Sequence, residues 1–148
     1  MVIEDRLEYN FTPYELPKSR FDEYRPYVVL GVLTTSIIFE AIGDARYDDG
    51  LKVQGKLFQA ASVASLLSLP FIIKDWDQWG YGVLSYICLR VAVFDPVYNL
   101  TRDLPIGYVG NTGLWDKGLG IFSPPTGIQL FGRAVFFTVG IKITIDEL

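Results

Sequence analysis

The chain has 148 residues, the size of one domain, with 50% hydrophobic residues, 20% charged residues and a mean hydropathy of +0.27. This composition excludes a disordered chain, a collagen-like repeat and a coiled coil, and a net charge of −4 without a basic block argues against a nucleic-acid partner. The absence of histidine excludes histidine bases and metal ligands, and the single cysteine, Cys88, excludes an intrachain disulfide and a cysteine zinc site.

Residues 1–26 form a charged segment that contains several aromatic side chains and prolines. They lack the apolar core that a signal peptide needs. Ser19 is a suitable N-cap, and the acidic residues Asp22 and Glu23 suit the positive end of a helix dipole, so a short helix is expected over residues 19–24. The sequence therefore predicts an exposed N-terminal segment, followed by a membrane helical domain over residues 27–148.

Four apolar stretches follow, at residues 27–43, 57–73, 80–94 and 127–145. A helix that crosses a bilayer needs about 20 mainly apolar residues, with about 17 as the lower end. The first two stretches reach this length, the third needs its flanking residues, and the fourth must include Arg133. The second stretch is rich in Ala and Ser, which allow helices to approach closely in lipid. These patterns predict an all-α, four-pass transmembrane helical bundle in a membrane, with a soluble helical bundle as the alternative.

The fourth stretch is also compatible with a strand. From Thr138 to Ile145, small or polar residues alternate with β-branched residues, and this alternation has the period of a strand. The spacing of Ile128, Phe131 and Val135 suits one side of a helix instead. We expect a helix over residues 128–141, followed by a strand or a frayed extension.

The connections between the apolar stretches differ in length. Residues 44–55 are short and highly charged. Residues 74–79 form a tight polar turn, so the second and third helices are expected to be antiparallel neighbours. Residues 95–123 are long and rich in Gly and Pro, which predicts an irregular loop over one membrane face, and loops of this length tend to be functional. Pro96 is expected to end the preceding helix.

Charged side chains inside apolar helices are costly and mark paired or functional sites. Glu40, Asp44 and Asp48 are spaced four apart and share one side of a helix. Arg90 lies at a similar depth in the third stretch, so Glu40 and Asp44 are expected to face Arg90, with Arg102 adding charge. The predicted polar cluster consists of Glu40, Asp44, Asp48, Arg90, Asp95, Asn99 and Arg102, and none of these residues is assigned a catalytic role.

Three interpretations of this cluster are open. Its ion pairs can neutralise each other and fix the register of the helices. Alternatively, Asp44, Asp48 and Asp95 supply the hard oxygen ligands that Mg²⁺ or Mn²⁺ prefers, in an enzyme that acts on a lipid phosphate at the membrane face. The run Asp44-Ala45-Arg46 resembles part of the Asp-rich helix of phosphatidyl-alcohol transferases, but the chain lacks the full spacing of that pattern. An ion or proton pathway would need a polar route, which residues 57–73 do not offer.

The runs at residues 40–50 (EAIGDARYDDG) and 90–117 are similar to segments of small, uncharacterised multi-pass membrane proteins of bacteria and bacteriophages. This resemblance implies a helical membrane protein with the polar cluster above, and it implies no activity. We therefore expect a structural, scaffolding or assembly role, in a larger complex or a viral membrane, rather than an enzyme. The expected partners are the lipid bilayer and other membrane subunits or further copies of the chain, without nucleic acid and without a cofactor.

Overall fold

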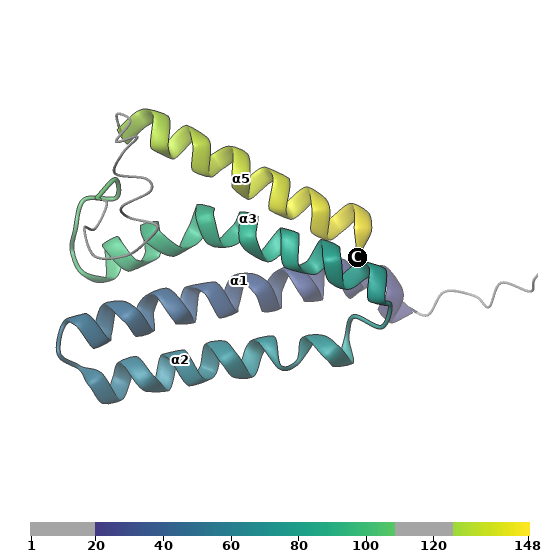
Figure 1. Cartoon of the computed structure of the whole chain (residues 1–148), viewed down its shortest axis with the longest axis horizontal. Helices are drawn as coiled ribbons and strands as arrows, with labels where there is room; N and C mark the ends of the chain where they lie inside the picture. The colour runs from purple at the N-terminus through teal and green to yellow at the C-terminus, as the bar shows by residue number, and fades with distance from the viewer. Residues whose placement is uncertain (1–19, 109–125) are drawn as a thin grey trace, which may run out of the picture.

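The computed structural model describes residues 20–108 and 126–148, and within these residues every regular element is a helix. The all-α prediction is therefore confirmed for this part of the chain. The elements, drawn in Figure 1, are α1 (Arg20–Asp48), α2 (Lys52–Leu66), the short 3₁₀ helix η1 (Leu69–Phe71), α3 (Trp76–Thr101) and α5 (Thr126–Glu147).

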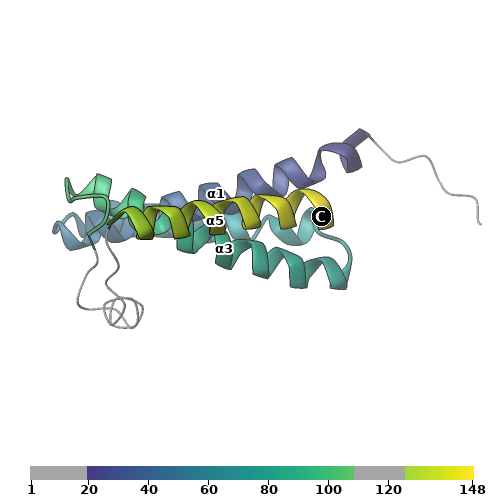
Figure 2. The same ribbon diagram turned by 90° about the horizontal axis from the view of Figure 1, so that it is seen from above.

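The helices lie in the order α2, α1, α3, α5 across the molecule (Figure 1). The prediction that the second and third helices are neighbours is therefore wrong, because α1 lies between α2 and α3. α1 and α2 form an antiparallel hairpin, α3 packs along α1, and α5 packs mainly on α3, with a smaller contact to α1 (Figure 1). In the perpendicular view the helices share one long axis, and the beginning of α1 diverges from α3 (Figure 2). The outer helices α2 and α5 therefore each have one side packed on a neighbour and another side open.

The turn between α1 and α2 is fixed by the backbone. Gly50 has a φ of 84°, a conformation that glycine adopts without strain. The N–H of Gly50 donates to the carbonyl of Tyr47 at 3.1 Å, and the N–H of Leu51 donates to that of Arg46 at 2.9 Å. This pair of bonds satisfies two carbonyls at the end of α1, so the chain reverses within three residues, 49–51.

Small residues set the distance between α1 and α2. A Cβ atom added to Gly55 would lie 2.7 Å from the backbone oxygen of Gly43 and 2.9 Å from the backbone nitrogen of Tyr47. Further along the hairpin, the hydroxyl oxygens of Ser36 and Ser62 lie 2.9 Å apart, and both residues are buried. Close approach through small and hydroxyl side chains is typical of helices that associate in lipid.

The contact between α3 and α5 has the same character. Ser85 Oγ donates to the carbonyl of Gly140 at 2.9 Å and lies 2.5 Å from Thr144 Oγ1. A Cβ atom on Gly140 would come within 2.9 Å of the Leu89 side chain, so only glycine allows this approach without a shift of Leu89. Ser85 and Thr144 are fully buried, and a hydrogen-bonded pair of hydroxyls therefore joins the two helices.

Burial in this chain is inverted relative to a protein that folds in water. Several of the most completely buried side chains are small or polar, whereas large apolar side chains are exposed. The exposed fraction is 75% for Val53, 83% for Phe71 and 72% for Phe131. Within residues 20–108 and 126–148, a compact apolar core lies where η1 and α3 meet α1, and it consists of Val29, Leu33, Ile37, Leu69, Ile73 and Leu89.

Among the described residues, three helices are long and apolar enough to cross a membrane: Arg20–Asp48, Trp76–Thr101 and Gly127–Glu147. The second apolar stretch behaves differently from the prediction of one continuous helix over residues 57–73. α2 begins earlier, at Lys52, and ends after 15 residues. Pro70 explains this end, because proline lacks an N–H and disfavours the α conformation of the residue before it. The structure thus identifies three candidate crossings and does not confirm the fourth.

Two further helix boundaries differ from the predictions. Residues 20–24 belong to α1 itself, which runs through Pro26, so the separate short helix predicted at the N-terminus is wrong where the structure describes it. Pro96 does not end α3, which continues to Thr101. In lipid the backbone has no water to bond to, so a helix tolerates the loss of one proline N–H more easily than an unwound end.

The fourth apolar stretch is helical from Thr126 to Glu147. The strand or frayed extension predicted after residue 141 is therefore wrong. A strand would leave its N–H and C=O groups without partners, because the described residues contain no second strand, whereas a helix bonds them internally. The predicted loop is irregular over residues 102–108, and residues 109–123 lie outside the described part of the chain.

The α1–α2 contact gives the first test. We expect Gly55→Ala to lower stability by about 1–3 kcal/mol, because its methyl group collides with backbone atoms of α1 rather than with a flexible side chain. The matched control is Gly31→Ala, which meets no atom within 4 Å and should leave stability unchanged or raise it by up to about 1 kcal/mol. Heating in detergent followed by size-exclusion chromatography measures both, and equal midpoints for the two variants would contradict the proposed contact.

Candidate functional site: the ion-paired polar cluster

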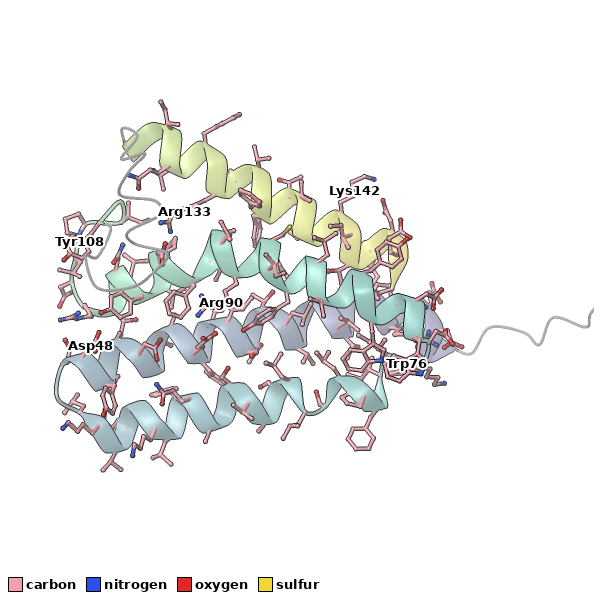
Figure 3. All side chains as sticks on the ribbon, viewed as in Figure 1. Asp48, Trp76, Arg90, Tyr108, Arg133 and Lys142 are labelled. Carbon is pink, nitrogen blue, oxygen red and sulfur yellow. The ribbon has the colours of Figure 1, made fainter. Side chains whose placement is uncertain are left out.

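The centre of the predicted cluster is an ion pair between α1 and α3. Arg90 Nη2 donates to Glu40 Oε1 at 2.7 Å, and the hydroxyl of Tyr86 donates to Glu40 Oε2 at 3.1 Å. The Arg90 guanidinium also lies 4.2 Å from the ring centroid of Phe94. Arg90 extends from α3 into the space between α3 and α1 (Figure 3). Both carboxylate oxygens of Glu40 are therefore bonded, and the pairing of Glu40 with Arg90 that the sequence predicts is present.

Asp44 contacts a different helix from the one predicted. Its Oδ1 accepts a hydrogen bond from Gln59 Nε2 of α2 at 2.7 Å, whereas the prediction placed it against Arg90 on α3. A residue four positions further along a helix is rotated by about 40°, because a turn contains 3.6 residues. Since α1 lies between α2 and α3, this rotation is enough to direct Glu40 to one neighbour and Asp44 to the other.

A second group of charges ties the ends of α1 and α3 together. Arg102 Nε donates to Asp49 Oδ1 at 3.0 Å, and its Nη1 donates to the Tyr98 hydroxyl at 2.6 Å. Tyr98 in turn donates to Asp48 Oδ2 at 2.5 Å. The hydrogen bond to Tyr98, together with the Asp49 carboxylate, raises the pKa of Arg102 above its usual value. The guanidinium lies 3.0 Å from Asp49 Oδ1 and 3.6 Å from Asp48 Oδ2, and it therefore pairs with both aspartates.

Asp95 is paired with a residue that the predicted cluster did not include. Arg133 Nη2 of α5 donates to Asp95 Oδ2 of α3 at 2.7 Å, and the Arg133 side chain is only 11% exposed. Figure 3 shows Arg133 extending from α5 toward α3. Arg133 interrupts an apolar stretch just as Arg90 does, and this signal would have identified it.

Asn99 forms hydrogen bonds with the segment that follows α3. It is buried, and its Nδ2 donates to the carbonyls of Ile106 and Tyr108 at 3.3 and 2.9 Å. The Asn99 carbonyl accepts from Leu104 N–H at 2.8 Å, while Asp103 takes up a left-handed conformation with a φ of 54°. This residue of the predicted cluster is therefore held within the helix end and the loop, rather than among the ion pairs.

The structure separates the three aspartates of the metal-site hypothesis. Asp44 bonds to Gln59, Asp48 to Tyr98, and Asp95 to Arg133, so each carboxylate is directed to a different partner. Over residues 20–108 and 126–148, no group of three or more His, Cys, Asp or Glu side chains is arranged to hold a metal ion.

Two tyrosines of this site were missed by the analysis of charged residues alone. Tyr86 and Tyr98 each lie four residues before the arginine that they accompany, Arg90 and Arg102. Residues four apart are neighbours on a helix, so a hydroxyl at this spacing from a buried arginine is a usable signal. Gln59 carried no such signal, because its partner Asp44 lies on another helix.

In comparisons with known proteins, no family model matches this chain, and no curated protein and no solved structure is significantly similar to it.

The ion pair between Glu40 and Arg90 gives the second test. We expect Arg90→Met or Glu40→Gln to lower stability by about 1–3 kcal/mol, because each leaves a half-buried charge without its partner. The double variant should recover part of this loss, since it removes both charges. The measurement is the midpoint of thermal unfolding in detergent.

The matched control for this pair is Lys142→Met. Lys142 also bonds a carboxylate, Asp146 at 2.5 Å, but it is exposed at the outer end of α5. Exposed pairs of this kind contribute little, so no measurable loss is expected. Single variants of Glu40 and Arg90 as stable as this control would contradict a structural role of the pair.

Proposed function

We propose that this chain is an integral membrane protein with four membrane-crossing segments, and that it acts as a structural or assembly component rather than as an enzyme. The observation that carries the proposal is the inverted burial, in which Ser36, Ser85 and Thr144 are fully buried while large apolar side chains are exposed. Such an arrangement is unfavourable in water and favourable in hydrocarbon, where large side chains contact lipid and hydroxyls bond across helix interfaces.

The exposed aromatic side chains also support a location in a membrane, with the long axis of the bundle across the bilayer. Trp76 is 90% exposed, and exposed Tyr24 and Tyr27 lie toward the same end of the bundle. Tyr47 and Tyr108 are exposed toward the opposite end. Figure 3 shows Trp76 and Tyr108 at the two ends of the long axis. Rings with an apolar body and a polar tip favour the two interfaces of a bilayer, so the helices between them span its apolar interior.

The fourth crossing is formed by α2 together with η1. These elements run antiparallel to α1 and return the chain to the opposite end of the bundle (Figure 1). Backbone bonds continue across the break, from Leu67 N–H to the Val63 carbonyl at 2.9 Å and from Phe71 N–H to the Ser68 carbonyl at 3.1 Å. No charged residue lies between positions 57 and 73. A segment that bonds its own backbone in this way is suited to lipid, despite the proline that divides it.

The ion pairs support a structural role. Glu40, Asp44, Asp48 and Asp95 each bond a side chain of a neighbouring helix. Paired charges between helices fix their relative register, which is the best-attested use of buried ion pairs. The open sides of α2 and α5 are then available to bilayer lipid, to other membrane subunits or to further copies of the chain.

The membrane assignment predicts that the expressed chain stays in the membrane pellet after washing at high pH with carbonate and is released by detergent. Peripheral proteins are removed by this wash, because they are held by contacts at the surface rather than by burial of apolar side chains in the bilayer. Quantitative blotting of pellet and supernatant measures the distribution. A chain that is released by carbonate and is monodisperse without detergent would overturn the proposal.

The number of crossings predicts which loops share a side of the membrane. In a Cys88→Ser background, Leu51→Cys reports the α1–α2 turn, and Lys74→Cys reports the segment before α3; both positions are exposed. Four crossings require an impermeant maleimide to label the two cysteines from opposite sides of sealed vesicles. Labelling of both from one side would show that α2 does not cross and would leave three crossings.

A further inference from the structure

We propose that the α1–α2 hairpin end binds the headgroups of anionic phospholipids through Arg46, Lys52 and Lys56. This surface, defined by these three residues, rests on the membrane role proposed above and adds to it a preference for one class of lipid. The residues flank the tight turn at Gly50, at one end of the bundle (Figure 1). Lys52 and Lys56 are exposed and lie four residues apart on α2, so they share one side of that helix.

Three carboxylates near this surface bond side chains other than its three cations. Asp49 accepts from Arg102, Asp48 accepts from Tyr98, and Asp44 accepts from Gln59. Within the part of the chain that the structure describes, none of the three cations of the surface forms a salt bridge, although Lys52 Nζ lies 6.0 Å from the Tyr47 ring centroid. Their positive charge is therefore available to an external anion.

At the opposite end of the bundle, the described acidic residues outnumber the described cations. Arg25 is paired with Asp22 there, and Lys142 with Asp146. The remaining described cations at that end, Arg20 and Lys74, are outnumbered by further acidic residues: Glu23, Asp75, Asp77 and Glu147. A count of Lys and Arg alone does not reveal this difference, because it leaves out the acidic residues.

The side chains beside the cations are suited to a lipid interface. Val53 and Leu57 directly follow Lys52 and Lys56 along α2 and are 75% and 66% exposed. A lysine at the end of an apolar helix extends its methylene groups along the apolar surface and places its ammonium group at the level of the lipid phosphates. Each basic residue near an anionic leaflet contributes about 1 kcal/mol to this attraction. The partner of this surface is thus a bilayer leaflet that contains anionic lipid.

The experiment compares phosphatidylglycerol with phosphatidylcholine. The full chain, purified in neutral detergent, is titrated with each lipid, and native mass spectrometry counts the lipids that remain bound. The wild type is expected to prefer phosphatidylglycerol. In the double variant Lys52→Gln with Lys56→Gln, this preference should fall by roughly 25-fold, which corresponds to the loss of two cations.

The matched control removes two cations from the opposite end, by Arg20→Gln with Lys74→Gln, and should keep the preference within roughly twofold, because those cations lie among excess acidic residues. Lys52→Arg with Lys56→Arg should also keep it, since the charge is preserved. Circular dichroism checks that the glutamine variant is folded. In a folded glutamine variant, a lower preference reflects the loss of charge alone, and the arginine variant tests whether the charge is sufficient. Equal losses in the two glutamine variants, or no preference in the wild type, would overturn the proposed surface.

The failure of this inference is distinguishable from the failure of the proposed function. A chain that resists carbonate extraction but binds both lipids equally would retain the membrane role and lose the headgroup surface. A chain that carbonate releases would lose both. Inorganic phosphate added to the titration should not displace the lipid, because the surface is built for a headgroup beside apolar side chains; displacement would contradict the role of Val53 and Leu57.

Discussion

The burial of polar side chains between helices, with large apolar side chains left exposed, is the constraint on which the rest of this structure depends. Where neighbouring hydrocarbon offers no hydrogen bonds, a hydroxyl or a charged group must find its partner on another helix. Ser36 meets Ser62, Ser85 meets Thr144, and Arg90 meets Glu40, each across an interface between two helices. α1 passes through Pro26 and α3 through Pro96, and each helix continues despite the missing proline N–H.

Each of the three main interfaces contains its own polar contacts. The α1–α2 interface has the bond of Asp44 to Gln59, the α1–α3 interface has the pair of Glu40 and Arg90, and the α3–α5 interface has that of Asp95 and Arg133. Apolar contacts alone would allow neighbouring helices to slide by a turn with little change in burial. A bond between two specific side chains permits only one register, so these contacts specify the arrangement more than they add to its stability.

The sequence was informative about depth along a helix and less informative about direction around it. The positions of Glu40 and Arg90 within their apolar stretches were enough to predict their pairing, which the structure contains. The partner of Asp44 depends on how α1 is rotated between two neighbours, and one sequence does not define that rotation. The apolar stretches also located α1, α3 and α5, because hydropathy depends on composition alone.

Helix ends were the weakest part of the prediction, because they depend on what surrounds the chain. The rule for proline rests on its missing N–H and on the clash of its ring with the preceding turn, and it predicted an end at Pro96 that α3 does not have. Pro70 does end a helix, yet the chain continues in turns that bond Ile73 N–H to the Leu69 carbonyl at 2.8 Å. The two prolines thus differ in whether the neighbouring helix surface keeps the α conformation favourable, which is a property of packing.

The distribution of charge follows from the same pairing. Between α1 and α3, Arg90 pairs with Glu40, and Arg102 pairs with both Asp48 and Asp49. Lys52 and Lys56 at the hairpin end are exposed and form no salt bridge within the described residues, which is the basis of the proposed headgroup surface. Internal pairing thus uses arginines of α3 and of the residues that follow it, whereas the external attraction proposed above uses lysines of α2.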